Sequence, residues 1–83
     1  MHNYIVMWTY YDEFAGTDGG HIEIQAENRE AAERKFYQHN RPYVLGYENG
    51  IPIVNPKGGF TCECVLTYAE WHSEGRPNSI LGR

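Results

Sequence analysis

The stretch that decides the fold reads Ile22-Glu-Ile-Gln-Ala26 and continues, after one residue, into Asn28-Arg-Glu-Ala-Ala-Glu-Arg-Lys-Phe-Tyr-Gln-His39. Its first part alternates apolar and polar residues, which is typical of a strand with one buried face. Its second part places apolar residues near the 3.6-residue period of an amphipathic helix. The sequence therefore predicts a strand over residues 20–26 that leads directly into a helix.

Both ends of this helix carry recognisable signals. Asn28 is a good N-cap, because its side-chain oxygen can accept a hydrogen bond from a free amide in the first turn. Glu30 stands four residues before Arg34, the spacing of a favourable ion pair on a helix surface. Pro42 stops the helix and disfavours helical geometry at the residue before it. Three turns of helix are marginal alone in water, so this one needs a sheet to lie on.

The segment before this stretch predicts the other half of a hairpin. Residues 4–11 are apolar and aromatic on both sides, which favours a central strand that is covered on both faces. Residues 12–20 are rich in glycine and aspartate and predict a long connection. The strands at 4–11 and 20–26 are therefore expected to pair antiparallel.

After the helix, residues 43–47 and 51–54 flank an Asn-Gly turn and predict short strands, the second at an edge because of Pro52. Residues 60–71 predict the longest late strand, with Cys62 and Cys64 on one face. The order β-β-α-β-(β)-β indicates an α+β fold, an antiparallel sheet of four or five strands with one helix on one face. Residues 1–71 are expected to form a single domain, and 72–83 a polar, loose tail.

Composition and charge narrow the class of protein. The 83 residues suffice for one thin domain, and 41% hydrophobic content excludes disorder. The longest apolar run is too short to cross a bilayer and lacks the features of a signal peptide, so a cytoplasmic protein is expected. The net charge is −4. Residues 1–28 carry five acidic side chains and neither lysine nor arginine, which disfavours general nucleic-acid binding and favours a basic partner.

No motif predicts catalysis, a cofactor or a metal. Cys62 and Cys64 are one residue apart, whereas structural zinc sites usually show Cys-x₂₋₄-Cys spacing, so buried core cysteines are the favoured interpretation. The four histidines are scattered, and nothing in the spacing pairs one with a thiol nucleophile. The paired glycines precede no helix and match no phosphate-binding pattern. We therefore expect a protein that is not an enzyme.

One segment combines aromatic and acidic residues. Large aromatics are the residues that most often anchor protein interfaces, and the chain has seven tyrosines. A patch at the end of the first strand is therefore the predicted partner-binding site, with Tyr10, Tyr11, Asp12, Glu13, Phe14 and Asp18 as its members. The alternative is that Tyr10 packs beneath the helix and the two adjacent carboxylates only solvate a loop.

The pattern Ile22-x-Ile-x-Ala26 followed by Asn28-x-Glu-Ala-Ala-x-x-x-Phe36 resembles the strand-to-helix step of small phage- and plasmid-borne accessory proteins, among them anti-CRISPR inhibitors. The resemblance covers about fifteen residues. It implies a non-enzymatic inhibitor, encoded by a mobile element, that blocks a host defence complex by binding to it. The resemblance carries over no individual site residue.

Three function classes follow from these observations. The first is a small acidic inhibitor that binds a host protein with a basic surface through its acidic and aromatic patch. The second is a nucleic-acid-binding module that uses the basic side of the helix, with Arg29, Arg34, Lys35 and Arg41. The third is a small metal- or cysteine-dependent protein. A homodimer through the sheet face opposite the helix also remains open, because a large exposed apolar patch is uncommon on a monomer.

Overall fold

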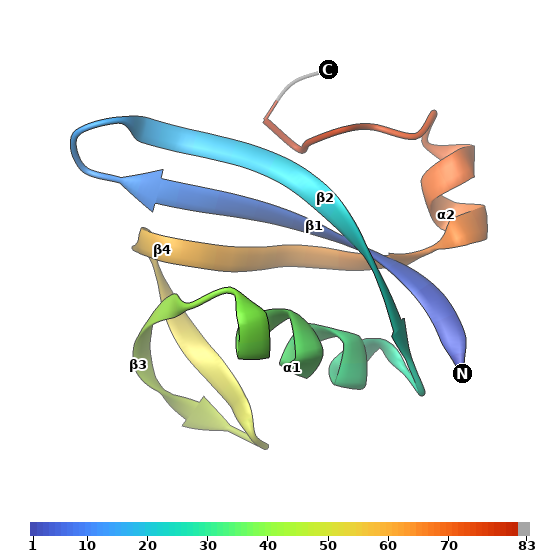
Figure 1. Cartoon of the computed structure of the whole chain (residues 1–83), viewed down its shortest axis with the longest axis horizontal. Coiled ribbons are helices and arrows are strands. Elements are labelled where there is room, and N and C mark those ends of the chain that lie inside the picture. Colours follow the sequence, from blue (N-terminus) through green and yellow to red (C-terminus); the bar gives the residue numbers. More distant parts are fainter. Residues whose placement is uncertain (82–83) are drawn as a thin grey trace.

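A computed structural model describes residues 1–81, without the side chains of Pro56 and Lys57. Within these residues, one antiparallel sheet has the strand order β2-β1-β4-β3 and two helices pack on it (Figure 1). The elements are β1 (His2–Asp12), β2 (Gly16–Ala26), α1 (Arg29–His39), β3 (Pro42–Glu48), β4 (Ile51–Thr67) and α2 (Tyr68–Ser73). The α+β fold, the antiparallel sheet and the helix packed on it confirm the prediction.

Helix α1 begins and ends where the sequence predicts. The side chain of Asn28 accepts a hydrogen bond of 2.8 Å from the Ala31 amide, which makes it the N-cap. Arg34 forms an ion pair of 3.2 Å with Glu30 one turn earlier. Pro42 opens β3, so the chain leaves the helix within three residues.

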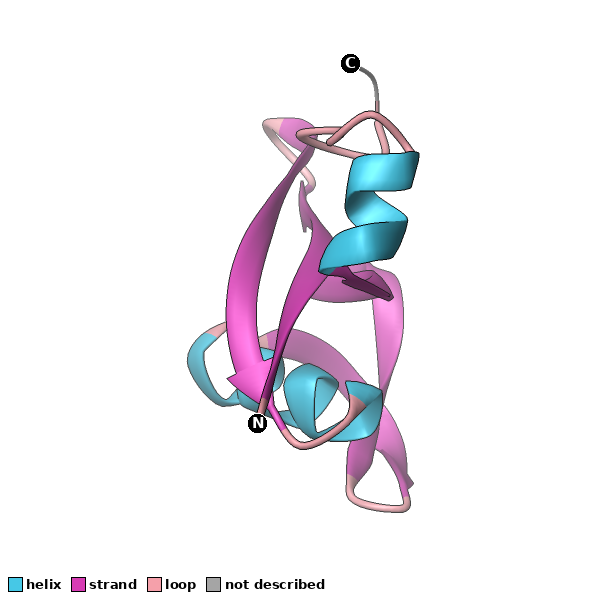
Figure 2. Ribbon diagram, turned by 90° about the vertical axis from the view of Figure 1, so that its right-hand side faces the viewer, coloured by secondary structure: helices cyan, strands magenta, loops and turns pink. Residues whose placement is uncertain are grey.

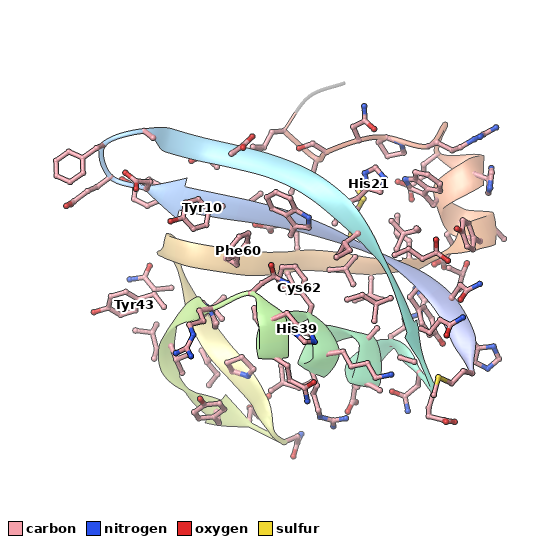
Figure 3. The ribbon with its side chains drawn as sticks, viewed as in Figure 1. Tyr10, His21, His39, Tyr43, Phe60 and Cys62 are labelled. Atoms are coloured by element: carbon pink, nitrogen blue, oxygen red, sulfur yellow. The ribbon has the colours of Figure 1, made fainter. Side chains whose placement is uncertain are left out.

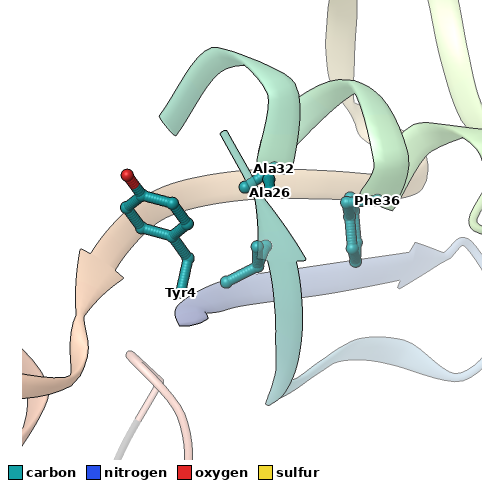
Figure 4. Packing of buried hydrophobic residues seen from close by; sticks show 5 residues of the cluster. Tyr4, Ala26, Ala32 and Phe36 are labelled. Atoms are coloured by element: carbon teal, nitrogen blue, oxygen red, sulfur yellow. The ribbon is translucent and has the colours of Figure 1, made fainter. Parts of the chain in front are cut away.

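β1 lies in the centre of the sheet and is buried on both sides. Its consecutive residues Tyr4, Ile5, Val6 and Met7 are at most 8% exposed. Because neighbouring side chains of a strand point to opposite faces, both faces must be covered here. Tyr4 and Val6 face α1, where they form the core with Ala26, Ala32 and Phe36 (Figure 4).

The opposite face of the sheet is covered by α2. Most of the residues that form this helix were predicted to be the end of a strand. β4 ends at Thr67, so the predicted strand over residues 60–71 is wrong in its last four residues. The Thr67 side chain accepts from the Glu70 amide and the Glu70 side chain accepts from the Thr67 amide, a capping box that starts a helix. Arg29 then holds Glu70 with two hydrogen bonds of 2.7 and 3.0 Å.

The segment after α2 lies against the sheet. The Trp71 indole nitrogen donates to the Pro77 carbonyl at 3.0 Å, and His21 Nδ1 lies 3.0 Å from the Asn78 carbonyl. These contacts belong to the first part of the predicted tail over residues 72–83, of which residues 82–83 lie outside the described part of the chain. Figure 2 shows how strongly the strands twist between α1 and α2.

A β-bulge in β4 separates the two cysteines. Met7 pairs with Cys64 and Trp8 with Cys62, so one extra residue of β4, Glu63, has no counterpart on β1. The expectation that both cysteines share a face is therefore wrong, because each lies on the face of its β1 partner. Cys62 packs on the α1 side, where its amide donates a 2.7 Å hydrogen bond to the Tyr37 hydroxyl.

The predicted connection over residues 12–20 is mostly strand. β2 begins at Gly16, so only residues 13–15 separate it from β1. The predicted pairing of the two strands is confirmed, with His2 opposite Ala26 and Asp12 opposite Gly16. The glycines of this segment, Gly16, Gly19 and Gly20, therefore belong to strand β2 and not to a turn.

Candidate functional site

Helix α1 covers only part of its face of the sheet. Towards the hairpin end, Tyr10 of β1 and Phe60 of β4 lie beyond the helix (Figure 3), and the ring of Trp8 packs beside that of Phe60. Phe60 is in the middle, with ring centroids 5.5 Å from Trp8 and 4.7 Å from Tyr10. Asp18 stands opposite Tyr10 on the neighbouring strand β2. Trp8, Tyr10, Asp18 and Phe60 line a shallow pocket of about 360 Å³, which we call the aromatic hollow.

The hollow rests on the core. The rings of Phe60 and Phe36 meet edge to face with centroids 6.1 Å apart, and Phe36 is only 1% exposed. Phe60 and Trp8 also pack against the buried cluster below α1. Edge-to-face contacts of this kind fix ring orientation as well as burying area. The base of the hollow is therefore anchored, while Tyr10 at its outer side is 37% exposed.

The absence of a side chain at Gly20 leaves the space that the Trp8 indole occupies. Gly20 pairs with Trp8 across β1 and β2, and a Cβ atom at Gly20 would lie 2.6 Å from Trp8 Cζ2. On the opposite face, a Cβ at Gly19 would lie 3.0 Å from Leu81 Cδ1. The two adjacent glycines therefore admit an indole on one face and the C-terminal segment on the other.

The structure divides the predicted patch. It brings Tyr10 and Asp18 together in the hollow, whereas Tyr11 points to the opposite face. Asp12 Oδ1 accepts from the amides of Phe14 and Ala15 at 2.8 and 3.1 Å, so this carboxylate shapes the turn.

Glu13 and Phe14 form the tip of the hairpin, away from the hollow. Phe14 is 92% exposed. Its hydrogen bond to Asp12 involves only its backbone, so its ring remains open to solvent.

Trp8 and Phe60 were not predicted as site residues. Phe60 is separated from Tyr10 by some fifty positions in sequence, and only the pairing of β4 with β1 brings it beside Tyr10. Trp8 stands two residues before Tyr10 on β1 itself. The sequence does carry one signal, the aromatic residues at alternate positions 8 and 10, which share a face of a strand.

The charged residue among those that line the hollow is acidic, Asp18. Asp18 Oδ1 accepts from the Gly19 amide at 2.9 Å, which orients the carboxylate. The β1–β2 hairpin contains no lysine or arginine. Ring faces carry negative electrostatic potential, so three aromatics and a carboxylate together attract a cation.

The basic residues of α1 are engaged within the fold. Arg29 binds Glu70 and the Val65 carbonyl, and Arg34 binds Glu30. Lys35 donates to the Gln25 carbonyl at 2.7 Å. Three of the four residues expected for a nucleic-acid surface therefore already have an acceptor in the protein, which weakens that interpretation.

The cysteines have the properties of packed thiols. Burial raises the pKa of Cys62 to about 12, and burial also raises the pKa of Cys64. A raised pKa disfavours the thiolate, the form that attacks electrophiles and binds metals. Among residues 1–81, no group of three or more His, Cys, Asp or Glu side chains is arranged to hold a metal ion.

Comparisons with protein-family models, curated proteins and solved structures give no match. Neither helix of residues 1–81 has the length and apolar character needed to span a bilayer. The geometry and charge of the hollow are therefore the features from which a function can be inferred.

Proposed function

We propose that the protein is a binding protein that holds a basic segment of another protein in the aromatic hollow. The observation that carries the proposal is the group of three contacting rings beside Asp18 on an uncovered part of the sheet. An arginine or lysine of the partner would stack on the Tyr10 ring and pair with the Asp18 carboxylate. Trp8 and Phe60 would form the apolar wall against its methylene groups.

In this proposal the consequence of binding is inhibition of a host protein. A surface that is acidic and aromatic is suited to a basic groove, including one that otherwise holds nucleic acid. The role of a mobile-element inhibitor of a host defence complex, which the sequence resemblance implies, is the form of this function that we favour. The support for it is the absence of lysine and arginine from the whole hairpin.

The test uses two synthetic peptides, one with a single arginine between glycine and serine residues and one with glutamine in its place. Calorimetry should detect binding of the arginine peptide only, and Tyr10→Ala should weaken it about tenfold, as expected for a hot-spot aromatic. Asp18→Asn should weaken it several-fold and make it less sensitive to salt.

Glu27→Gln is the matched control, since it removes one carboxylate of the same acidic segment outside the hollow. Equal affinity for the two peptides, or equal effects of Asp18→Asn and Glu27→Gln, would contradict the proposal.

A further inference from the structure

The outer edge of β3 is unusually apolar. β3 is the last strand of the sheet, so one side of its backbone has no partner strand within the described residues. Its alternate residues Tyr43, Leu45 and Tyr47 are 58, 64 and 70% exposed. Natural edge strands are usually protected by lysines, prolines or inward-pointing charges, because an open edge pairs with other strands. Here the one proline of β3, Pro42, is its first residue, and charged residues stand only at the two ends, Arg41 just before β3 and Glu48 at its last position.

The other candidate surfaces for self-association are less suitable. β2, the opposite edge of the sheet, carries Asp18 and Glu23 with no basic residue in its hairpin, so two copies would repel each other there. The sheet face opposite α1, for which the sequence left a homodimer open, is already covered by α2 and the C-terminal segment. Tyr68 binds Glu23 across that face at 2.6 Å.

We propose that a second copy of this chain docks along the β3 edge, with the two β3 strands antiparallel about a two-fold axis near Leu45. In such a pair the start of each strand lies beside the end of the other. Arg41 of one copy then lies near Glu48 of the other, and the same contact repeats across the axis. A parallel arrangement would instead bring like charges together, so the charges themselves select the antiparallel one.

The same geometry limits the strength of the dimer. The pairing of β3 with β4 is irregular on both sides of Val44, and bulges at an edge shorten the stretch that a second strand can follow. β3 has only seven residues. Such a contact falls at the small end of specific interfaces, so we expect dissociation constants on the order of 100 µM. This inference is independent of the aromatic hollow, which lies on β1, β2 and β4.

Sedimentation velocity from about 10 µM to 1 mM tests the dimer. The natural chain should shift from monomer to dimer across this range, and Leu45→Lys should remain a monomer. Ile22→Lys, an equally drastic change at a 42% exposed residue of β2, should dimerise as the natural chain does. A monomer at every concentration, a dimer unaffected by Leu45→Lys, or a dimer lost in Ile22→Lys would each overturn the proposal.

Charge exchange tests the antiparallel arrangement without touching an apolar residue. Arg41→Glu and Glu48→Arg should each weaken the dimer several-fold, because each places like charges across the axis. The double variant, with the two charges exchanged, should regain most of the lost affinity. Failure of the double variant to recover would overturn the arrangement, and thermal unfolding of each variant shows that the monomer still folds.

Discussion

One face of the sheet contains two regions with similar residues and different surroundings. In the core between α1 and the sheet, Val6 and Phe36 are 0 and 1% exposed. Beyond the end of α1, on the same strand as Val6, Tyr10 is 37% exposed, although its ring lies 4.7 Å from that of Phe60, at an interplanar angle of 55°. The first region is closed by the helix, and the second is open with an acidic residue at its rim.

The two regions differ in which aromatic residues the fold requires. A fully buried ring contributes through all the surface it removes from water. A ring at the outer side of the hollow contributes one contact and keeps much of its surface exposed. Substitutions in the two regions should therefore separate stability from binding.

The largest effect is expected for Phe36→Ala. The change leaves a cavity beneath α1 in the centre of the core and should lower the free energy of unfolding by about 3–5 kcal/mol. Urea unfolding measures the loss. A loss below about 1 kcal/mol would mean that α1 is not held by this ring.

A smaller effect is expected for Gly20→Ala. The new methyl group would displace the Trp8 indole, and such overpacking costs about 1–3 kcal/mol. Near-ultraviolet circular dichroism should change, and affinity for the arginine peptide should fall with it. Gly16→Ala is not a suitable control, because Gly16 has a φ of +87° and an added side chain would be strained there. Thr17→Ala, on the same strand, provides the comparison.

Tyr10→Ala should affect peptide binding more than stability, in contrast to Phe36→Ala. It removes one aromatic contact at a partly exposed position, so the loss of stability should be about 1 kcal/mol. The loss of peptide binding should be about tenfold. If Tyr10→Ala destabilised the protein as much as Phe36→Ala, the open region would be part of the core and the comparison would fail.

The smallest effect concerns pH and the attachment of α2. The hydrogen bonds from Arg29 and the Thr67 amide lower the pKa of Glu70 to about 2, from 4.5. A carboxylate with a lowered pKa stabilises the fold above its unfolded pKa, and this contribution is lost as the pH falls from about 4.5 towards 2. Glu70→Gln should therefore unfold with a weaker pH dependence across this interval. Identical pH profiles of the two proteins would contradict the role of this contact.

The local signals in the sequence predicted the centre of the fold. Asn28 capped the helix as expected, and the alternation of residues 20–26 placed β2 beside β1. Residues 68–71 were predicted as strand because they continue an apolar and aromatic run. The Thr67-x-x-Glu70 pattern of a capping box was present in the sequence and was the signal for α2.

The hollow could be predicted only in part. Tyr10 and Asp18 were expected from composition, but the position of Phe60 beside them depends on the register of β4. That register changes at a bulge that no alternation of apolar residues reveals, because the extra residue Glu63 reads as one more outward position. The glycine pair 19–20 was read as a turn, since its effect depends on an indole and a C-terminal segment distant in sequence.

The proposed function requires that the aromatic hollow binds a cationic side chain. The most direct measurement is a titration of the ¹⁵N-labelled protein with the arginine peptide, followed by amide and indole NMR shifts. If the hollow binds the arginine side chain, the Trp8 indole and the amides of Asp18, Gly19 and Gly20 should show saturable shifts, with little change at α1. Shifts absent from these groups, or concentrated at α2 and β3, would contradict the proposed function.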